Sequence, residues 1–263
     1  MELNLIGEIY MTICISAICT ENNEDHIVFS VDHMITTGIG QFEHDINKYK
    51  LLNKNTVGMI TGNALLMDYF LEEDFTKKSF SEIEQIIEEK FKQKRLEKIQ
   101  KEILDVFSID FEYVKEILKN PITNDIQSHI LKKVSKERLN TAILLIGFEN
   151  KKAKISEIVD TGIDTYDQIN FNTIGSGSIQ AQNTLLFQKH SRNDDLKTTL
   201  YNVYKAKKNA EVMQGVGKET DIGYINKNGI TMLDEKSINI LDKIYYIELN
   251  YGKEHEKLND LNI

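Results

Sequence analysis

The sequence predicts an α+β fold, a four-layer α/β/β/α sandwich in which two antiparallel sheets pack together and helices cover both outer faces. Three observations predict it. The segments run in the order strands, helices, strands, helices, strands along the 263 residues. Two short runs rich in β-branched residues, Ile13–Ala17 and Ile27–Val31, flank the polar segment TENNEDH, which is typical of a hairpin. The run Ala142–Gly147 is apolar on both faces and predicts a buried central strand.

The region from about 64 to 138 is predicted to be helical, because apolar residues recur there at helical spacing. Ser79 or Ser81 is the expected N-cap of a long helix, and Glu82 or Glu84, three residues on, would complete a capping box. Shorter helices are expected over Ala64–Glu73, over Asp110–Lys119 before Pro121, and within DIQSHILKKVSKER.

The second half returns to strands and then alternates. A helix is expected after the turn at Gly175, and a second one starts at Asn193 or Asp194 as N-cap. The Asn228–Gly229 pair is a strong hairpin signal. The remaining expected elements are strands over Ala153–Val159, Asp221–Asn226, Ile230–Leu233 and Ile244–Leu249, and a helix over Ile179–Lys189.

Composition and charge exclude several classes of function. The net charge of −9 and the lack of a basic patch with interleaved aromatics argue against nucleic-acid binding. No run of eighteen apolar residues occurs, so no membrane span is expected, and the acidic start does not resemble a signal peptide. Cys14 and Cys19 lie on opposite faces of one strand, so we expect free thiols and a cytoplasmic location. The six histidines have no metal-ligand spacing, so neither a metal nor another cofactor is expected.

An acid, a hydroxyl, an amine and a glycine stand at the ends of the first predicted strands. Asp32 follows the second strand, and Thr36 comes four residues after it. Lys48 follows Asp32 by sixteen residues and opens the next strand, and Gly62 follows Lys48 by fourteen where that strand turns into a helix. Functional sites are commonly built at such positions on a rigid scaffold.

These ungapped spacings resemble those of the proteasome β-type subunits and their simpler bacterial relatives, which belong to the N-terminal nucleophile hydrolases. A second block agrees. The segment TIGSGSIQAQNTLL resembles the family's Gly-Ser-Gly-Ser turn and following helix, with Ser176 at the supporting serine. The segment DDLKTTLYNVYKAKKNAEVMQGVGKETDIGYINKNG resembles its long helix, loop and next strand. The resemblance covers most of 11–70 and 140–248.

The resemblance implies a single domain over 1–263. Residues 1–11 would be a propeptide or an extra edge strand. The helical stretch from about 72 to 138 is longer than the helix pair that the family needs, so we expect it to be a projecting helical insertion.

The resemblance also implies the chemistry. An N-terminal threonine supplies the nucleophilic hydroxyl, and its own α-amine is the general base. Lys48 would favour the reactive form of the hydroxyl, Asp32 would hold Lys48, and Ser176 would support them. The backbone N–H of Gly62 would bind the oxyanion, and Thr36 would bind the peptide backbone as an added strand.

The nucleophile position is open between two residues. An alignment on the family's Thr-Ile pattern places Met11 there, whereas a shift by one residue places Thr12 there. Strand alternation favours the first alternative, because a slip of one residue turns the side chain to the opposite face. In the loop after the long helix, the family's aspartate and serine are replaced by Met213 and Val216.

Two functions from different classes therefore remain. The first is a threonine-type endopeptidase that acts on peptides or unfolded proteins in a homo-oligomeric ring, with an ATPase as its further partner, once Thr12 becomes the chain's start. The second is a catalytically silent ring or scaffold subunit of the same fold, which acts through protein–protein contacts and keeps residues 1–11.

Overall fold

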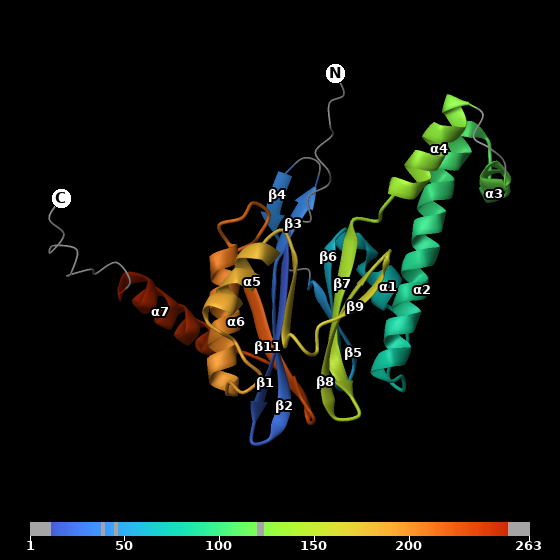
Figure 1. Ribbon diagram of the computed structural model, residues 1–263. Coiled ribbons are helices and arrows are strands. Elements are labelled where there is room, and N and C mark those ends of the chain that lie inside the picture. Colours follow the sequence, from blue (N-terminus) through green and yellow to red (C-terminus); the bar gives the residue numbers. More distant parts are fainter. Residues whose placement is uncertain (1–11, 38–39, 45–46, 120–123, 252–263) are drawn as a thin grey trace, which may run out of the picture.

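A computed structural model of the protein describes residues 12–37, 40–44, 47–119 and 124–251. They form an α+β fold with two antiparallel five-stranded sheets, as predicted (Figure 1). The first sheet has the strand order β10-β1-β2-β11-β12 and the second the order β5-β6-β7-β8-β9. The strands of the first sheet are β1 (Ile13–Glu21), β2 (Glu24–Asp32), β10 (Phe171–Gly175), β11 (Thr220–Asn226) and β12 (Gly229–Met232).

The second sheet and a separate ribbon complete the strands. The second sheet contains β5 (Tyr49–Asn53), β6 (Thr56–Gly62), β7 (Thr141–Glu149), β8 (Lys152–Val159) and β9 (Gly162–Thr165). The ribbon consists of β3 (Met34–Thr37) and β4 (Gly40–Glu43), which lie above the end of the first sheet in Figure 1. The expected strand over 142–147 is the centre of β7, and its side chains are buried throughout.

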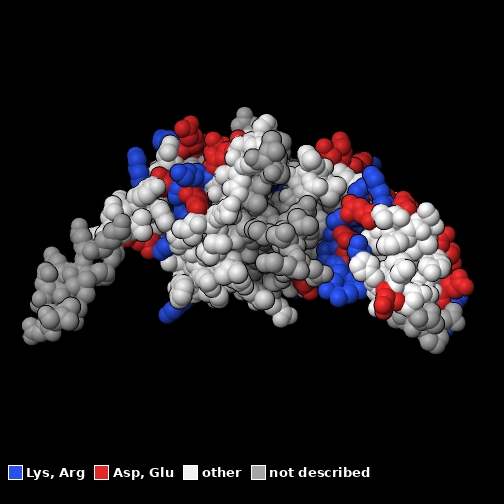
Figure 2. Space-filling view, turned by 90° about the horizontal axis from the view of Figure 1, so that it is seen from above, with Lys and Arg blue, Asp and Glu red and all other residues white. Residues whose placement is uncertain are grey.

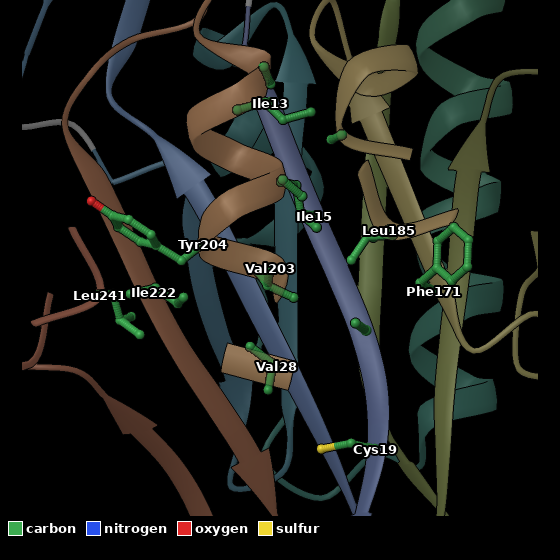
Figure 3. Close-up of a cluster of buried hydrophobic side chains, with 14 of the residues drawn as sticks. Ile13, Ile15, Cys19, Val28, Phe171, Leu185, Val203, Tyr204, Ile222 and Leu241 are labelled. Carbon is green, nitrogen blue, oxygen red and sulfur yellow. The ribbon is translucent and has the colours of Figure 1, made fainter. Parts of the chain in front are cut away.

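Three apolar clusters join the layers. The cluster between the sheets combines Ile18 and Phe29 of the first sheet with Met59 and Leu144 of the second. The outer face of the first sheet packs against α5 (Ser178–Phe187) and α6 (Leu196–Ala210). Figure 3 shows this second cluster, in which side chains from β1 and β2 meet those of the two helices.

The second sheet is covered on its outer face by α1 (Met67–Leu71) and α2 (Phe80–Ile99). The rings of Phe70 and Phe91 stack there with centroids 4.1 Å apart. Strand alternation explains how one strand serves two layers, because Cys14 lies in the cluster between the sheets and Cys19 in the helix-facing cluster. Both cysteines are free, as predicted, and the structure shows that both are buried.

A helical projection extends beyond the sheets (Figure 1). It has its own apolar cluster, which includes Ile99, Leu104 and Ile130. Ser79 caps α2 in a capping box with Glu82, as one of the two expected alternatives. Beyond α2 come a π-helical turn (Gln100–Leu104), a 3₁₀ turn (Asp105–Phe107), α3 (Phe111–Lys119) and α4 (Asp125–Lys136). No helix in the described segments is long and apolar enough to cross a membrane.

Three local predictions were wrong. The expected strand over Ile244–Leu249 is part of helix α7 (Glu235–Tyr251), because Leu241 packs at helical spacing with Ile238 and Tyr245 against the α6 layer. The N-cap of α6 is Asp195, whose side chain accepts a hydrogen bond from the Thr198 backbone at 2.8 Å. The predicted helix over Ala64–Glu73 begins as a 3₁₀ turn (Ala64–Leu66) and ends at Leu71.

An ion pair ties the sheets together at the end of the sandwich where β2 begins. Arg192 donates from Nε to Asp25 Oδ1 at 3.2 Å and from Nη2 to Asp25 Oδ2 at 2.5 Å. The same carboxylate accepts the Ala153 backbone N–H of the second sheet at 3.1 Å. Desolvation raises the pKa of Asp25, but the hydrogen bonds from Arg192 and Ala153 outweigh it and hold the pKa below its ordinary value.

We therefore expect Asp25→Asn to lower the free energy of unfolding at pH 7 by about 2 kcal/mol, because charged hydrogen bonds are lost. A depressed pKa stabilises the folded state above the unfolded-state pKa, which is about 3.9, and this contribution disappears as pH falls through the folded-state value. Urea unfolding at pH 7 and at pH 3 measures it. A difference between wild type and variant that is equally large at both pH values would contradict the assignment.

Candidate functional site

Three of the predicted site residues, Thr12, Asp32 and Lys48, meet at the end of the sandwich where β1 begins and β2 ends. The register explains this, because Cys14 lies opposite Val31 in β2 and Ile13 opposite Gly175 in β10. The end of β2 therefore brings Asp32 beside the start of β1. Lys48 comes from the other sheet, where its carbonyl accepts the Ile60 N–H at 3.0 Å just before β5. Thr12, Asp32 and Lys48 are all buried.

The Thr12 hydroxyl lies between the two charged groups. It donates a hydrogen bond to Asp32 Oδ1 and accepts one from Lys48 Nζ. Lys48 Nζ is also 2.9 Å from Asp32 Oδ1, so the three groups form a closed triangle. In this arrangement an ammonium group stands against the hydroxyl oxygen, where it favours negative charge on that oxygen.

This geometry overturns the expectation from strand alternation that Thr12 would face away from Lys48. Thr12 precedes β1, whose first paired residue is Ile13. Thr12 is nevertheless two residues before Cys14, whose side chain faces the second sheet, so the alternation continues to Thr12 and turns its hydroxyl to Lys48. The competing residue, Met11, lies outside the described residues, as does the rest of the expected propeptide or edge strand.

Asp32 is held by two backbone amides besides Lys48. Its Oδ1 accepts the Ile13 N–H at 3.2 Å, and its Oδ2 accepts the Gly217 N–H at 2.7 Å. A buried carboxylate is tolerated when its lone pairs are satisfied in this way. The loop after α6 thus serves the site through its main chain, while Val216 is buried and Met213 packs against the same core.

A second buried lysine supports that loop. Lys207 of α6 is fully buried, and its Nζ donates to Glu211 Oε1 and to the Lys218 carbonyl, each at 2.7 Å. Burial lowers the pKa of Lys207, although Glu211 opposes the shift. From the other side, Glu43 Oε1 of β4 accepts the backbone N–H groups of Lys218 and Glu219. The loop that holds Asp32 is therefore fixed at both flanks.

Ser176 contacts the main chain of Thr12. Its hydroxyl is 3.4 Å from the Thr12 carbonyl oxygen, which is a long hydrogen bond. The preceding Gly175 has a φ of +105°, and a Cβ there would lie 2.2 Å from the same carbonyl oxygen. The glycine thus permits close approach of β10 to Thr12.

For Gly62 and Thr36 the structure gives the positions in their strands but does not test the predicted roles. Gly62 ends β6 opposite Thr141, has a φ of +86°, and a Cβ there would meet the Asn140 carbonyl oxygen at 2.1 Å. Packing alone therefore explains the glycine, and its oxyanion role stays a prediction. Thr36 lies in β3 opposite Gln41. Its role in binding a peptide strand also stays a prediction.

Sequence reasoning missed several residues that the site uses. Gly217 acts through a backbone N–H, and the sequence signal for it was weak, a glycine two residues after Gly215. A signal for Lys207 did exist, because Val203, Lys207 and Ala210 are spaced to share one helix face. Among the residues that the structure describes, no group of three or more His, Cys, Asp or Glu is placed to hold a metal ion.

The nearest thiol is a poor nucleophile. Cys14, two residues after Thr12, is fully buried, and its Sγ is 3.6 Å from the Ile60 carbonyl oxygen. Burial raises the pKa of the Cys14 thiol well above its ordinary value, with Lys48 opposing the shift. Because the thiolate is the reactive form, the hydroxyl of Thr12 is the better candidate. Figure 2 looks down on the end of the sandwich where β1 begins, and the acidic and basic side chains in that view lie mainly toward its two sides.

Comparison with known proteins adds no assignment: no model of a known protein family matches the chain, and neither does any curated protein sequence. The site is therefore interpreted from its own geometry.

The Lys48–Asp32 pair is expected to be essential for stability. Lys48→Met leaves Asp32 buried without a counter-charge, so the free energy of unfolding should fall by about 3–5 kcal/mol. The neighbouring Lys50 pairs with the exposed Asp68 at 3.5 Å, so Lys50→Met should cost at most about 1 kcal/mol. Denaturant unfolding measures both. Equal stabilities of the two variants would show that the buried pair contributes nothing.

Proposed function

We propose that the chain is a threonine-type peptidase of the proteasome-like N-terminal nucleophile family and that Thr12 is its nucleophile. The single observation that supports this most is the position of the Thr12 hydroxyl between Lys48 Nζ and Asp32 Oδ1 in a buried triangle. The resemblance of the surrounding spacings points to the same chemistry. Cleavage of the Met11–Thr12 bond would make Thr12 the start of the chain.

Cleavage supplies the missing base. In the intact chain the Thr12 nitrogen is part of a peptide bond and cannot accept a proton. After cleavage it is an α-amine with an ordinary pKa near 8, on the carbon next to the one that bears the hydroxyl. The amine takes the hydroxyl proton while Oγ1 attacks the substrate carbonyl carbon, and it then gives the proton to the leaving amine. Water, activated by the same amine, hydrolyses the resulting ester.

The remaining residues would hold this geometry. Lys48 stabilises negative charge on Oγ1 during attack, and Asp32 fixes Lys48 from the opposite sheet. Ser176 holds the Thr12 carbonyl. By resemblance, Gly62 N–H would bind the oxyanion, Thr36 would pair with substrate backbone, and the active form would be a homo-oligomeric ring with an ATPase partner.

A silent scaffold subunit is the second candidate, and one observation favours it. The same Asp32 carboxylate joins Ile13, Gly217 and Lys48, which are contacts that hold β1, the loop after α6 and the second sheet together without any chemistry. In addition, Met213 and Val216 replace the polar loop residues of the resembled family with apolar packing. In this alternative residues 1–11 remain attached.

The experiment uses a shortened chain that begins at Thr12 and the full chain beside it. We expect the shortened chain to hydrolyse fluorogenic peptides, and Thr12→Ala to lower kcat/KM by about a thousandfold or more, because a nucleophile and its base act as a unit. Thr12→Ser should keep a measurable part of the rate. Thr231→Ala, which alters an exposed threonine of β12, is the matched control and should leave the rate unchanged.

Intact mass decides between the two candidates. Loss of residues 1–11 from the full chain, together with modification of Thr12 by an electrophile that bridges a free α-amine and its neighbouring hydroxyl, supports the peptidase. An unprocessed chain, combined with a shortened chain that folds but neither reacts nor hydrolyses peptides, would establish the scaffold instead.

A further inference from the structure

Helix α7 is held firmly on α6 by one of its faces. Ile238, Leu241 and Tyr245 pack against the apolar cluster beneath it. The Tyr204 hydroxyl hydrogen-bonds Asp242 at 2.7 Å, and the Tyr245 hydroxyl hydrogen-bonds Asn209 at 2.9 Å. Figure 1 shows that the helix nevertheless runs outward from the sandwich, so that much of its length is not covered by the body. Its position is therefore defined while another face stays open.

That open face carries an apolar stripe. Ile240 is 51% exposed, Ile244 43%, Ile247 64% and Tyr251 78%. Their spacing of four, three and four residues places them along one line of the helix. At about 100° per residue, the line lies about a third of a turn from the packed face. A partner on the stripe would therefore sit beside α7 and would not collide with α6.

The spacing identifies the kind of partner. Alternating steps of four and three residues form the a and d positions of a two-stranded coiled coil, in which each helix inserts its side chains between those of an equivalent helix. A stripe of this kind is complementary to itself, which suits a two-fold contact between identical chains.

Charges beside the stripe favour one orientation. Lys243 is exposed and occupies a g position, and Glu248 occupies an e position five residues later. In a parallel pair these positions face each other across the seam, so Lys243 of one helix meets Glu248 of the other. Lys205 and Tyr201 already hold the Glu248 carboxylate, which remains about half exposed. The acceptor is thus pre-positioned at the edge of the stripe.

We propose that α7 is a dimerisation helix, which pairs in parallel with α7 of a second copy through Ile240, Ile244, Ile247 and Tyr251. The contact is independent of the peptidase proposal. It joins two chains about a two-fold axis, whereas ring contacts between neighbouring subunits run head to tail.

Mass measurement in solution tests the pairing. The full chain should have a native mass of at least twice its 30.4 kDa, and Ile247→Asp should halve the native mass. Leu186→Asp is the matched control, because Leu186 is 57% exposed on α5, away from the stripe. It should keep the wild-type mass. A monomeric wild type, or a mass that Ile247→Asp leaves unchanged, would overturn the proposal.

A cysteine scan tests the orientation. Both native cysteines are buried, so Ile247→Cys adds an accessible thiol. In a parallel pair the two copies of residue 247 meet, and mild oxidation should give a disulfide-linked dimer that reducing agent separates. A non-reducing gel without that dimer overturns the parallel arrangement. A monomer whose added thiol becomes reactive only after residues 252–263 are deleted would assign the stripe to the chain's own end and overturn the pairing.

Discussion

The structure depends on one charge pair that spans its two sheets. Asp32 belongs to the first sheet and Lys48 enters from the second, and both side chains are withdrawn from water. Such a pair is costly to bury, and it persists only where every remaining polar atom of the pair is satisfied. The Asp32 oxygens meet this condition with the amides of Ile13 and Gly217. The start of β1 and the course of the loop after α6 follow from that requirement.

The site consequently relies on main-chain N–H groups as well as on side chains. Val216 is buried against the helix-facing cluster, and a Cβ at Gly177 would lie 2.9 Å from it. The loop therefore packs Met213 and Val216 inward, while the Gly217 N–H donates to Asp32 and the Glu219 N–H donates to Glu43. Lys207 Nζ donates a hydrogen bond to the Lys218 carbonyl of the same loop. Apolar side chains at 213 and 216 are compatible with this use of the loop.

Much of the fold could be predicted because the spacing of apolar residues along the sequence indicates which side of a strand or helix is buried. The alternation in β1 and the apolar run in β7 were sufficient to place strands, and the Ser79–Glu82 pair marked a helix start. Helix α7 could not be recognised because Ile-Tyr-Tyr-Ile also suits a strand, and the residues that distinguish the two, Ile238 and Leu241, precede that run. Residues 235–251 form a helix because that conformation packs Ile238 and Leu241 against the α6 layer.

The sequence indicated which side chains form the site, but it did not indicate how the Thr12 side chain is oriented or which backbone groups take part. Spacing placed Asp32 and Lys48 at strand ends, and the packing of the two sheets against each other brings those ends together. The orientation of Thr12 was predicted wrongly because the alignment gave Met11 the face toward Lys48, whereas Thr12 shares the face of Cys14, which points to the second sheet. Backbone donors such as Gly217 N–H carry no residue-type signature at all, so only coordinates reveal them.

Gly175 has a consequence for the segment that begins at Thr12. Chain starts usually fray, because nothing anchors their first residues. Here Gly175 of β10 packs closely against the Thr12 carbonyl, which also accepts a hydrogen bond from the Ser176 hydroxyl. The Ile13 N–H donates to Asp32. If the chain were cut just before Thr12, its new terminus would stay bound to the body of the protein. Little conformational entropy of that terminus would then remain to be lost when it binds another molecule.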